Sequence, residues 1–504
     1  MPLILAIDQG TTGTTCMLVD EQGKVRARAY SEFTQHYPRP GWVEHDAAEI
    51  WDVTLRVARD ALAEVGAPGR GRGAMEEVAA IGITNQRETV VLWDRATGEP
   101  VHRAIVWQDR RTTALCRSLK ERGEEGWVRQ KTGLLLDPYF SATKLAWVLD
   151  EDAELRRRAE AGELAAGTID SWLIWKLTGG RVHATDHTNA SRTLLYDIHA
   201  RAWDDELLAL FGVPRAILPE VRPSSGVFGE TPADLLGMPL PVAGAAGDQQ
   251  AALFGQGCYA PGAAKNTYGT GAFLLLHTGS EPVASERGLL TTVACDARGE
   301  PAYALEGAIF IAGAAVQWLR DELGIIEVAS ETEALARSLQ GNEGVYLVPA
   351  FVGLGAPHWE PEARGTVVGL TRGSGRAHLA RAALEAMAYS TRDVLAAMEA
   401  ESGHRAEALT VDGGASDNGW LMQFQADLLD LPVLRPQVTD TTALGAAGLA
   451  GVAVGVWPDG DAFVRSRAAP DRFEPDMAAE ERVGLVAGWE RALEAARVWA
   501  ASAP

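Results

Sequence analysis

A short polar turn near the start of the chain combines residue types suited to binding phosphate. It reads Asp8-Gln9-Gly10-Thr11-Thr12-Gly13 and lies between two apolar runs, Leu3–Ile7 and Cys16–Val19. This pattern predicts a β-hairpin with the polar residues at its tip. Glycine lets a bulky anion approach the backbone, and amide and threonine hydroxyl groups can donate hydrogen bonds to phosphate oxygens. An ordinary hairpin turn has the same composition. The rest of the chain has to decide between the two interpretations.

The carboxylate of this turn indicates a metal. Asp8 would repel a phosphate group unless a cation lay between them, so we expect it to face Mg²⁺. The sequence contains no GxxxxGK[ST] motif, and only Lys265 lies beside a glycine-rich turn. We therefore expect a metal and backbone amides to carry most of the phosphate charge.

A second turn has the same plan as the first. Residues 265–279, KNTYGTGAFLLLHTG, place polar residues and Gly-Thr-Gly before an apolar strand. Two such hairpins, each opening an α/β half, predict an internal duplication. We expect the two tips to face each other across a deep cleft between the halves and to bind a nucleotide's phosphates from both sides.

Polar residues also follow the predicted strand Val78–Ile83. Arg87 and Glu88 stand at its end, where α/β proteins commonly place ligands, and together they could bind the hydroxyl groups of a polyol. A surface ion pair is the alternative. Trp107 and Tyr139 lie beside polar turns and could either wall a small pocket or pack in the core.

One carboxylate is a candidate for proton transfer. Asp248 follows a Gly/Ala-rich stretch and precedes the helix-like run QQAALFGQG. It could cap that helix, or it could accept a proton from a bound hydroxyl group within reach.

Two further segments could contact the rest of a nucleotide. Residues 306–323, EGAIFIAGAAVQWLRDEL, predict a helix with Gly313 and Gln317 on one face. The sequence VDGGA at 411–415 predicts a turn between a strand and a helix, which exposes backbone N–H groups to an anion or to adenosine. A tight turn without a ligand explains the glycine pair equally well.

Alternating strand and helix patterns place the chain in the α/β class. Asp46 and Glu49 predict a capping box for a helix that ends before an exposed loop at 66–77. Proline-rich residues 230–244 predict a loop that connects two larger units, and residues 378–402 predict a helix. The last part, 458–504, predicts a packed terminal helix.

Composition limits the classes of function. The chain has 504 residues, more than one core usually holds, and a formal net charge of -22, which argues against nonspecific binding to nucleic acid or anionic membranes. Its four cysteines are far apart and predict a reducing cytoplasm without structural disulfides. The longest apolar run, Ala443–Trp457, is too short for a membrane span, and no signal peptide is expected.

Read together, ordered motifs resemble the FGGY carbohydrate kinases, and among them those acting on glycerol. The motifs are DQGTT, GITNQRET, AIVWQDRR, DPYFSATK, GDQQAALFGQ, NTYGTG, VPAFVGLGAP and VDGGA. The resemblance implies two ribonuclease-H-like (actin-like ATPase) domains, 1–247 for the polyol and 248–504 for the adenine nucleotide. It also implies transfer of the ATP γ-phosphoryl group to the 3-hydroxyl of glycerol with Mg²⁺, by a homodimer or homotetramer.

The resemblance assigns a role to each matching position. Asp248 is the implied base, and Asp8 is the residue implied to organise Mg²⁺ through water. The implied glycerol contacts are Arg87, Glu88, Trp107, Tyr139, Asp248, Gln249 and Phe273. The implied nucleotide contacts are Gly10, Thr11, Thr12, Gly13, Thr270, Gly313, Gln317, Gly414 and Asn418.

Two alternatives stay open. One is a related kinase for another polyol or a ketose such as xylulose or ribulose. The other is a non-catalytic actin-like or chaperone-like ATPase, which would use the same hairpins without needing Arg87, Glu88 and Asp248 around a polyol.

Overall fold

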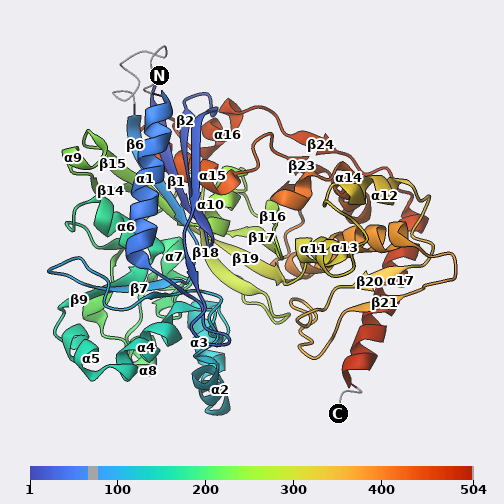
Figure 1. Ribbon diagram of the computed structural model, residues 1–504, viewed down its shortest axis with the longest axis horizontal. Helices are drawn as coiled ribbons and strands as arrows, with labels where there is room; N and C mark the ends of the chain where they lie inside the picture. The colour runs from blue at the N-terminus through green and yellow to red at the C-terminus, as the bar shows by residue number, and fades with distance from the viewer. Residues whose placement is uncertain (66–77, 502–504) are drawn as a thin grey trace.

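Two units, each built on a mixed β-sheet, make up the molecule (Figure 1). The computed structural model describes residues 1–65 and 78–501. The loop predicted at 66–77 lies outside the described residues. The family-level expectation of two α/β units is confirmed, whereas the boundary at 247/248 stays a prediction.

The first sheet begins with the predicted hairpin. β1 (Leu3–Gln9) pairs antiparallel with β2 (Gly13–Asp20), and β6 (Val78–Asn85) runs parallel to β1. The strand order is β14-β15-β6-β1-β2-β3. The remaining strands are β3 (Val25–Glu32), β14 (Ser225–Glu230) and β15 (Pro241–Gly247).

One prediction fails here. Residues 230–244 do not form a connection between the units, because they hold the short helix α9 (Ala233–Leu236) and much of β15. β15 lies inside the first sheet, parallel to β6. The three prolines of this stretch flank the helix or begin the strand, positions where a missing N–H costs little.

The second sheet repeats the topology of the first. β16 (Ala264–Tyr268) pairs antiparallel with β17 (Ala272–Gly279), and β22 (Leu409–Asp412) runs parallel to β16 as β6 does to β1. The strand order is β18-β19-β17-β16-β22-β23-β24. This common plan confirms the internal duplication. The other strands are β18 (Leu290–Cys295), β19 (Pro301–Ile309), β23 (Val433–Arg435) and β24 (Asp471–Phe473).

The helix predicted over 306–323 is wrong in its first part. Residues Glu306–Ile309 belong to β19, and the helix α11 begins only at Gly313 and ends at Asp321. Hydrophobic residues repeat every two residues in a strand and every 3.6 residues in a helix, and the Gly/Ala-rich composition of this stretch hides the change between the two.

Two helices occupy the space between the sheets (Figure 1). α10 (Asp248–Gly255) and α15 (Thr441–Ala453) pack against the first sheet in one apolar cluster. A Cβ on Gly445 would meet the carbonyl oxygen of Ala251 at 1.8 Å, and one on Gly82 would meet that of Ala446 at 2.0 Å. The small residues of the apolar run at 443–457 therefore serve close packing.

Other helices cover the outer faces. α1 (Ala47–Val65) and α6 (Ile169–Leu177) cover the first sheet, and α11 with α13 (Arg376–Ser402) covers the second. The Asp46 carboxylate accepts the N–H groups of Ala48 and Glu49, which confirms the cap. Glu49 bonds Thr34 instead of completing the capping box.

A third sheet and several helices extend the first unit. The strands are β4 (Gln35–His36), β5 (Glu44–His45), β7 (Val90–Asp94), β8 (Ala104–Ile105) and β9 (Leu164–Thr168). The helices are α2 (Thr113–Glu121), α3 (Glu125–Thr132), α4 (Ser141–Glu151), α5 (Ala153–Glu160), α7 (His187–Ala190) and α8 (Asp205–Phe211). Two two-stranded pairs belong to the same unit: β10 (Ala184–Asp186) with β13 (Glu220–Arg222), and β11 (Tyr196–Asp197) with β12 (Ala202–Trp203). In the second unit, β20 (Tyr346–Val348) pairs with β21 (Thr366–Val368).

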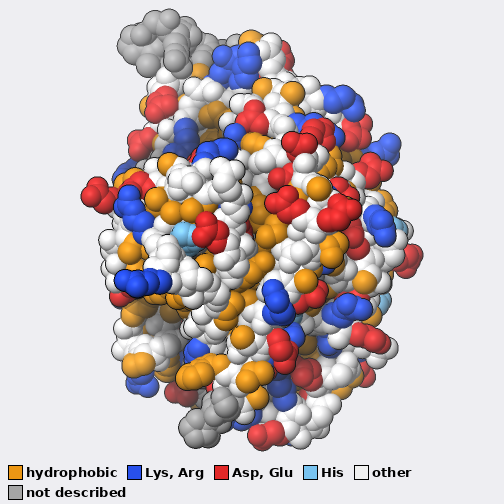
Figure 2. Space-filling model, turned by 90° about the vertical axis from the view of Figure 1, so that its right-hand side faces the viewer, with side chains coloured by type: hydrophobic (Ala, Val, Ile, Leu, Met, Phe, Trp, Pro, Cys, Tyr) orange, Lys and Arg blue, Asp and Glu red, His pale blue; other side chains and the backbone are white. Residues whose placement is uncertain are grey.

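The second unit ends in four more helices. They are α12 (Glu331–Arg337), α14 (Gly419–Leu429), α16 (Gly460–Ser466) and α17 (Ala479–Ala501). On α17 Trp489 is buried, as predicted for a packed helix, whereas Trp499 is exposed. On the face seen in Figure 2, acidic and basic side chains are interspersed around a central band of hydrophobic ones. Within 1–65 and 78–501, no helix has both the length and the apolar character needed to cross a membrane.

Candidate active site

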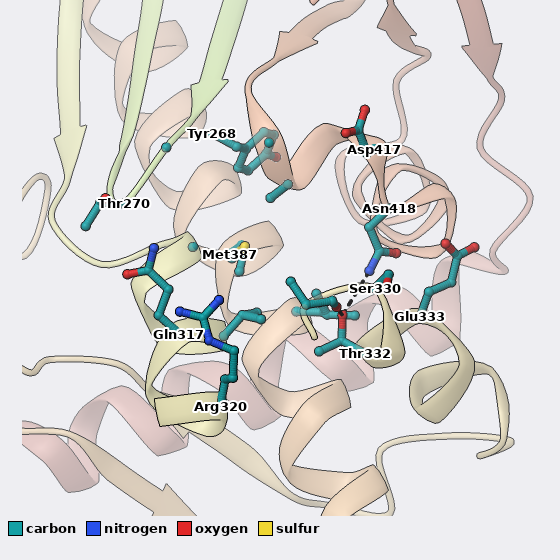
Figure 3. A pocket seen from close by; sticks show the side chains of 17 residues that line it. Tyr268, Thr270, Gln317, Arg320, Ser330, Thr332, Glu333, Met387, Asp417 and Asn418 are labelled. Carbon is teal, nitrogen blue, oxygen red and sulfur yellow. Dashed lines mark hydrogen bonds between the residues drawn. The ribbon is translucent and has the colours of Figure 1, made fainter. Parts of the chain in front are cut away.

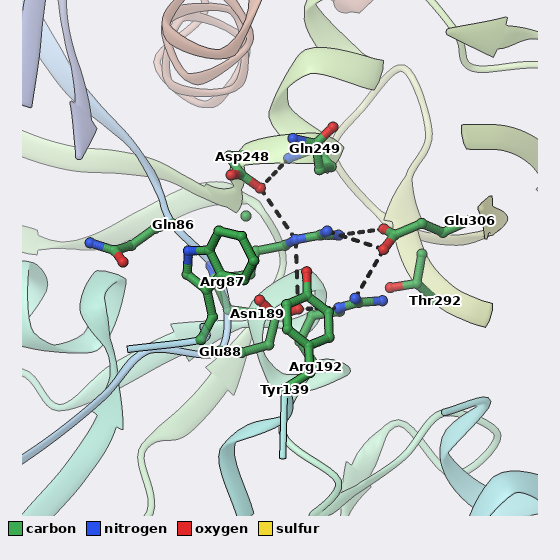
Figure 4. Close-up of polar contacts among 12 residues, drawn as sticks. Gln86, Arg87, Glu88, Tyr139, Asn189, Arg192, Asp248, Gln249, Thr292 and Glu306 are labelled. Atoms are coloured by element: carbon green, nitrogen blue, oxygen red, sulfur yellow. Dashed lines mark hydrogen bonds and ion pairs between the residues drawn. The ribbon is translucent and has the colours of Figure 1, made fainter. Parts of the chain in front are cut away.

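A buried charge cluster joins the two units (Figure 4). Arg87, just beyond β6, donates to both carboxylate oxygens of Glu306 on β19, at 2.5 and 3.1 Å. Arg192 donates to Glu306 at 3.0 Å and to Glu88 at 2.6 Å. All four side chains are buried. Arg87 and Glu88 are therefore not a surface ion pair. They form part of a charge-assisted network between two sheets.

Glu88 is held in an uncommon backbone conformation. Its φ is 61°, in the left-handed region that non-glycine residues seldom adopt. Such strain persists only where the surroundings over-determine it, and it concentrates at functional sites. Burial raises the pKa of Glu88, although Arg192 and Arg87 oppose this effect.

Glu306 stays ionised in this cluster. Burial alone would raise its pKa, but the two arginines hold the pKa of Glu306 at about 2. A carboxylate with two guanidinium partners is satisfied without a proton. It therefore fixes the orientation of Arg87 from the opposite unit.

Asp248 presents its carboxylate at the edge of the cluster. The Nε atom of Arg87 lies 3.2 Å from its Oδ1 atom, and 31% of the Asp248 side chain remains exposed against 2% for Arg87. Asp248 is the first residue of α10, whose N-cap is Gly247. Besides its ion pair with Arg87, its side chain accepts a hydrogen bond from the adjacent Gln249 N–H. The helix-cap interpretation is therefore wrong. Burial, opposed by Arg87, raises the pKa of Asp248.

Gln249 and Lys265 connect this edge with the second hairpin. The Lys265 ammonium donates to the Gln249 side chain and, at 2.8 Å, to Thr267. Burial lowers the pKa of Lys265 to about 8. The lysine beside the second hairpin therefore lies next to Asp248, whose pKa it also lowers.

Two aromatic rings stand beside the cluster. Trp107 and Tyr139 meet edge to face at 5.6 Å, and the Arg192 guanidinium lies 5.7 Å from the Tyr139 ring. The Trp107 Nε1 atom donates to the Thr11 hydroxyl at 2.9 Å. Trp107 thus connects the ring pair with the tip of the first hairpin.

The first hairpin tip is held through its backbone. Gly10 N–H donates to the Gly13 carbonyl at 2.9 Å, closing the turn. Gln86 donates to the Gly10 carbonyl at 3.2 Å, and Gln35 donates to the Thr11 carbonyl at 3.0 Å. Gln35 in turn accepts from the buried His45. Thr12 is exposed at the tip.

Asp8 and Asp248 lie close enough for their charges to interact. Burial, together with the charges of Asp248 and Asp440, raises the pKa of Asp8 to about 7. A hydrogen bond from Thr442 acts in the opposite direction and lowers this pKa. Neighbouring carboxylates of this kind suit a divalent cation, which would relieve their repulsion. Within the described ranges no group of three or more His, Cys, Asp or Glu side chains forms a metal cage.

A separate cavity of about 560 Å³ lies in the second unit (Figure 3). Among the predicted nucleotide contacts, Thr270, Gly313, Gln317, Gly414 and Asn418 all line it. The N–H groups of Gly313 and Ala314 bond the second hairpin tip, so α11 is fastened to that tip. Asn418 caps α14 through Leu421 N–H at 3.0 Å. The cavity lining is otherwise mostly apolar, as an adenine ring requires.

The structure does not bring every predicted residue to one place. Gly10 to Gly13 are absent from the lining of this cavity, and so is Asp8. Phe273 is half-buried on β17 and packs against the cluster of Leu253 and Leu275. Whether the two hairpin tips face each other across a cleft stays a prediction.

Sequence reasoning missed Arg192, Glu306 and Thr442. Arg192 lies in a stretch of mixed turn signals, HATDHTNASRT. Thr442 directly precedes the run Ala443–Trp457, which the sequence showed only as apolar. Glu306 offered a clear signal, since a carboxylate inside an apolar strand needs a charged partner. Because residue 306 was predicted to lie in a helix, the need of Glu306 for a charged partner was not recognised.

Comparisons with known proteins agree along the whole chain. Models of the N-terminal and C-terminal domains of the FGGY family of carbohydrate kinases match residues 3–255 and 264–454. A curated glycerol kinase of Petrotoga mobilis is 57% identical over 98% of each chain, and one of Deinococcus radiodurans is also 57% identical over 98% of each. The crystal structure of Plasmodium falciparum glycerol kinase with ADP superimposes with a TM-score of 0.92 at 34% identity, covering 98% of both chains.

Proposed function

Because the chain belongs to the FGGY family of carbohydrate kinases, we propose that it transfers the γ-phosphoryl group of ATP to the 3-hydroxyl of glycerol. The products are ADP and sn-glycerol 3-phosphate. The observation that carries this proposal is the partly exposed Asp248 carboxylate, held 3.2 Å from the buried Arg87 guanidinium.

Glycerol is held by the buried cluster and the two rings. Arg87 donates to one hydroxyl group and Glu88 accepts from another, while Trp107 and Tyr139 wall the three-carbon chain. Gln249 and Phe273 complete the pocket. Since Glu306 and Arg192 fix Arg87 and Glu88, the binding groups are oriented before the substrate arrives.

Asp248 accepts the proton of the reacting hydroxyl. Its side chain is partly exposed, and its raised pKa makes it a better base than an ordinary aspartate. In a loose phosphoryl-transfer transition state the proton leaves late, so a carboxylate suffices. Arg87 keeps the carboxylate aimed at the substrate.

Mg-ATP spans both units. The adenosine part occupies the 560 Å³ cavity through Gly313, Gln317, Gly414 and Asn418. The phosphates meet the backbone of Gly10, Thr11, Thr12 and Gly13 on one side and Thr270 on the other. Asp8 would hold Mg²⁺ through water, and the bound ion would supply positive charge next to the phosphate oxygens. The active form is a homodimer or homotetramer.

A substrate panel tests the proposal. ADP release is measured at fixed Mg-ATP with glycerol, xylulose, ribulose or no acceptor. We expect release to depend on glycerol and to yield sn-glycerol 3-phosphate in equal amount. Faster release with a ketose would assign another substrate, and release without any acceptor would favour an ATPase that does not phosphorylate sugars or polyols.

A further inference from the structure

A second large cavity lies away from the charge cluster, and we propose that it binds an organic anion with an apolar body. It measures about 1020 Å³ and is called the distal cavity here. The turn Gln22–Val25, between β2 and β3, forms its side in the first unit, and segments 436–438 and Val464–Pro470 form its side in the second. It lies near the top of Figure 1, between β2, α16 and β23.

The distal cavity is at the far end of the strands from the proposed active site. β2 runs from Gly13 at the phosphate-binding tip to Asp20, just before the turn that lines the cavity. Eight strand residues span about 25 Å. The distal cavity is therefore distinct from the nucleotide cavity, with which it shares no lining residue.

The charge of the lining has one sign. Lys24, Arg465 and Arg467 line the distal cavity, and no aspartate or glutamate does. Within the described part of the chain, no ion pair joins these three side chains to a carboxylate. The chain has a formal net charge of -22, so three positive side chains around one cavity create a local positive charge that favours an anionic ligand.

Two buried polar atoms of the lining lack partners. The Nε atom of Arg467 and the Oε1 atom of Gln256 have no hydrogen-bond partner among the described residues. The other Gln256 amide atom donates to Asp412, and Arg467 donates to the Gly255 carbonyl, so both side chains are held in place. The unpartnered Nε atom is itself buried, so Arg467 contributes its positive charge to the cavity rather than this N–H group.

Uncharged polar residues and a larger set of apolar residues complete the lining; the polar ones are Gln22, Gln256, Thr410, Gln437 and Ser466. Val25, Leu434, Val438, Leu444 and Val464 provide hydrophobic side chains on both sides of the cavity. A bare inorganic anion would leave this surface and most of the volume unused. A ligand with an anionic group and an apolar chain would bury both kinds of surface, as drug-sized ligands do in cavities of this size.

Calorimetric titration of the full chain with n-octyl phosphate, kept below its micellar concentration, tests the proposal without measuring turnover. We expect saturable binding of one molecule per chain, weaker binding of inorganic phosphate, and none of octyl glucoside at the same concentration. Binding of octyl glucoside as tight as that of octyl phosphate would overturn the requirement for an anion. The absence of saturable octyl phosphate binding would overturn the site.

Variants locate the binding. Arg467→Met should weaken octyl phosphate binding about tenfold or more, the effect of losing one hydrogen bond to a charged group. Because Arg467 also holds Gly255, the double variant Lys24→Met/Arg465→Met, which alters only exposed side chains, should weaken it by a similar factor. Arg372→Met, an exposed charge outside the lining, should leave it unchanged. Unchanged affinity in the double variant would contradict the proposal, whether or not the chain phosphorylates glycerol.

Discussion

At the scale of single residues, the candidate site depends on buried charges that satisfy each other. Arg87 is bonded by Glu306 on one side and lies beside Asp248 on the other, so its guanidinium cannot rotate away. Breaking one partner of a buried pair leaves an uncompensated charge, which costs far more than losing a surface pair. This asymmetry makes the cluster sensitive to single substitutions.

His45 gives a prediction at this scale. It is fully buried, its Nε2 atom donates to Gln35 at 2.7 Å, and its Nδ1 atom faces the Gln86 amide. Burial, together with the charge of His36, lowers the pKa of His45 to about 4. The neutral ring therefore supports Gln35 and Gln86, which hold the first hairpin tip.

The sign of the pH dependence follows from that lowered pKa. Between pH 6.5 and pH 4 the unfolded chain binds a proton at His45 that the folded chain does not, so acid lowers the free energy of unfolding. The loss is on the order of 3 kcal/mol over this window. Urea unfolding of the wild type and of His45→Gln at several pH values checks it: the difference in stability between the two should shrink as the pH falls from 6.5 to 4. A constant difference would contradict the assignment.

Part of the site could be predicted at the residue scale. Arg87 and Glu88 were recognised as polar residues at a strand end, where parallel sheets place ligands, and Asp248 as a carboxylate before a helix-like run. The role of Arg192 could not be predicted, because its partners lie 104 and 114 positions away in the sequence. Only the folded chain brings Glu88, Arg192 and Glu306 together.

At the scale of elements, two hairpins with the same connections carry the proposed phosphate contacts. Apolar runs beside polar Gly/Thr turns predicted both hairpins correctly, because this pattern is local in the sequence. The prediction of a helix over 306–323 was wrong for its first residues, since Gly and Ala contribute little to a hydrophobic period. The prediction of a connecting loop over 230–244 was wrong, because proline occurs at the start of a strand as readily as in a linker.

Gly313 gives a prediction at the element scale. A Cβ at this position would meet the Gly269 carbonyl oxygen at 2.6 Å, and the Gly313 N–H donates to the same oxygen at 3.0 Å. Gly313→Ala must therefore displace α11 from the second hairpin tip. We expect the KM for ATP to rise about tenfold, the effect of a modest packing strain, with little change in the KM for glycerol.

Steady-state kinetics with both substrates varied measures this effect. Gly484→Ala is the matched control, since Gly484 lies in α17 and a Cβ there would meet nothing within 4 Å. Equal KM values for ATP in Gly313→Ala and the wild type would show that the contact between α11 and the tip does not position the nucleotide.

At the scale of the whole molecule, Glu306 fastens one unit to the other. It lies on β19 of the second sheet and bonds Arg87 and Arg192, both of the first unit. The packed helices α10 and α15 form another part of the contact, through glycines that allow close approach. The duplication therefore positions the charge cluster at the junction of two similar halves.

Glu306→Gln tests this connection. Removing the charge leaves two buried guanidinium groups without their shared carboxylate, so we expect a loss of about 3–5 kcal/mol in the free energy of unfolding. Urea denaturation measures it, and the KM for glycerol should rise because Arg87 loses its anchor. Asp205→Asn, which removes an exposed partner of Arg215, is the control and should leave stability nearly unchanged. A stability loss no larger than in that control would contradict the role of Glu306.

The proposed reaction depends on a carboxylate that accepts the proton of a bound alcohol while Mg-ATP is held separately. The most direct test compares glycerol-dependent ADP release by the wild type and by Asp248→Asn, with nucleotide affinity measured by calorimetry. We predict turnover lower by about 10²–10⁴-fold, the usual contribution of a general base, and ATP affinity close to that of the wild type. Near-normal turnover in Asp248→Asn would contradict the central claim.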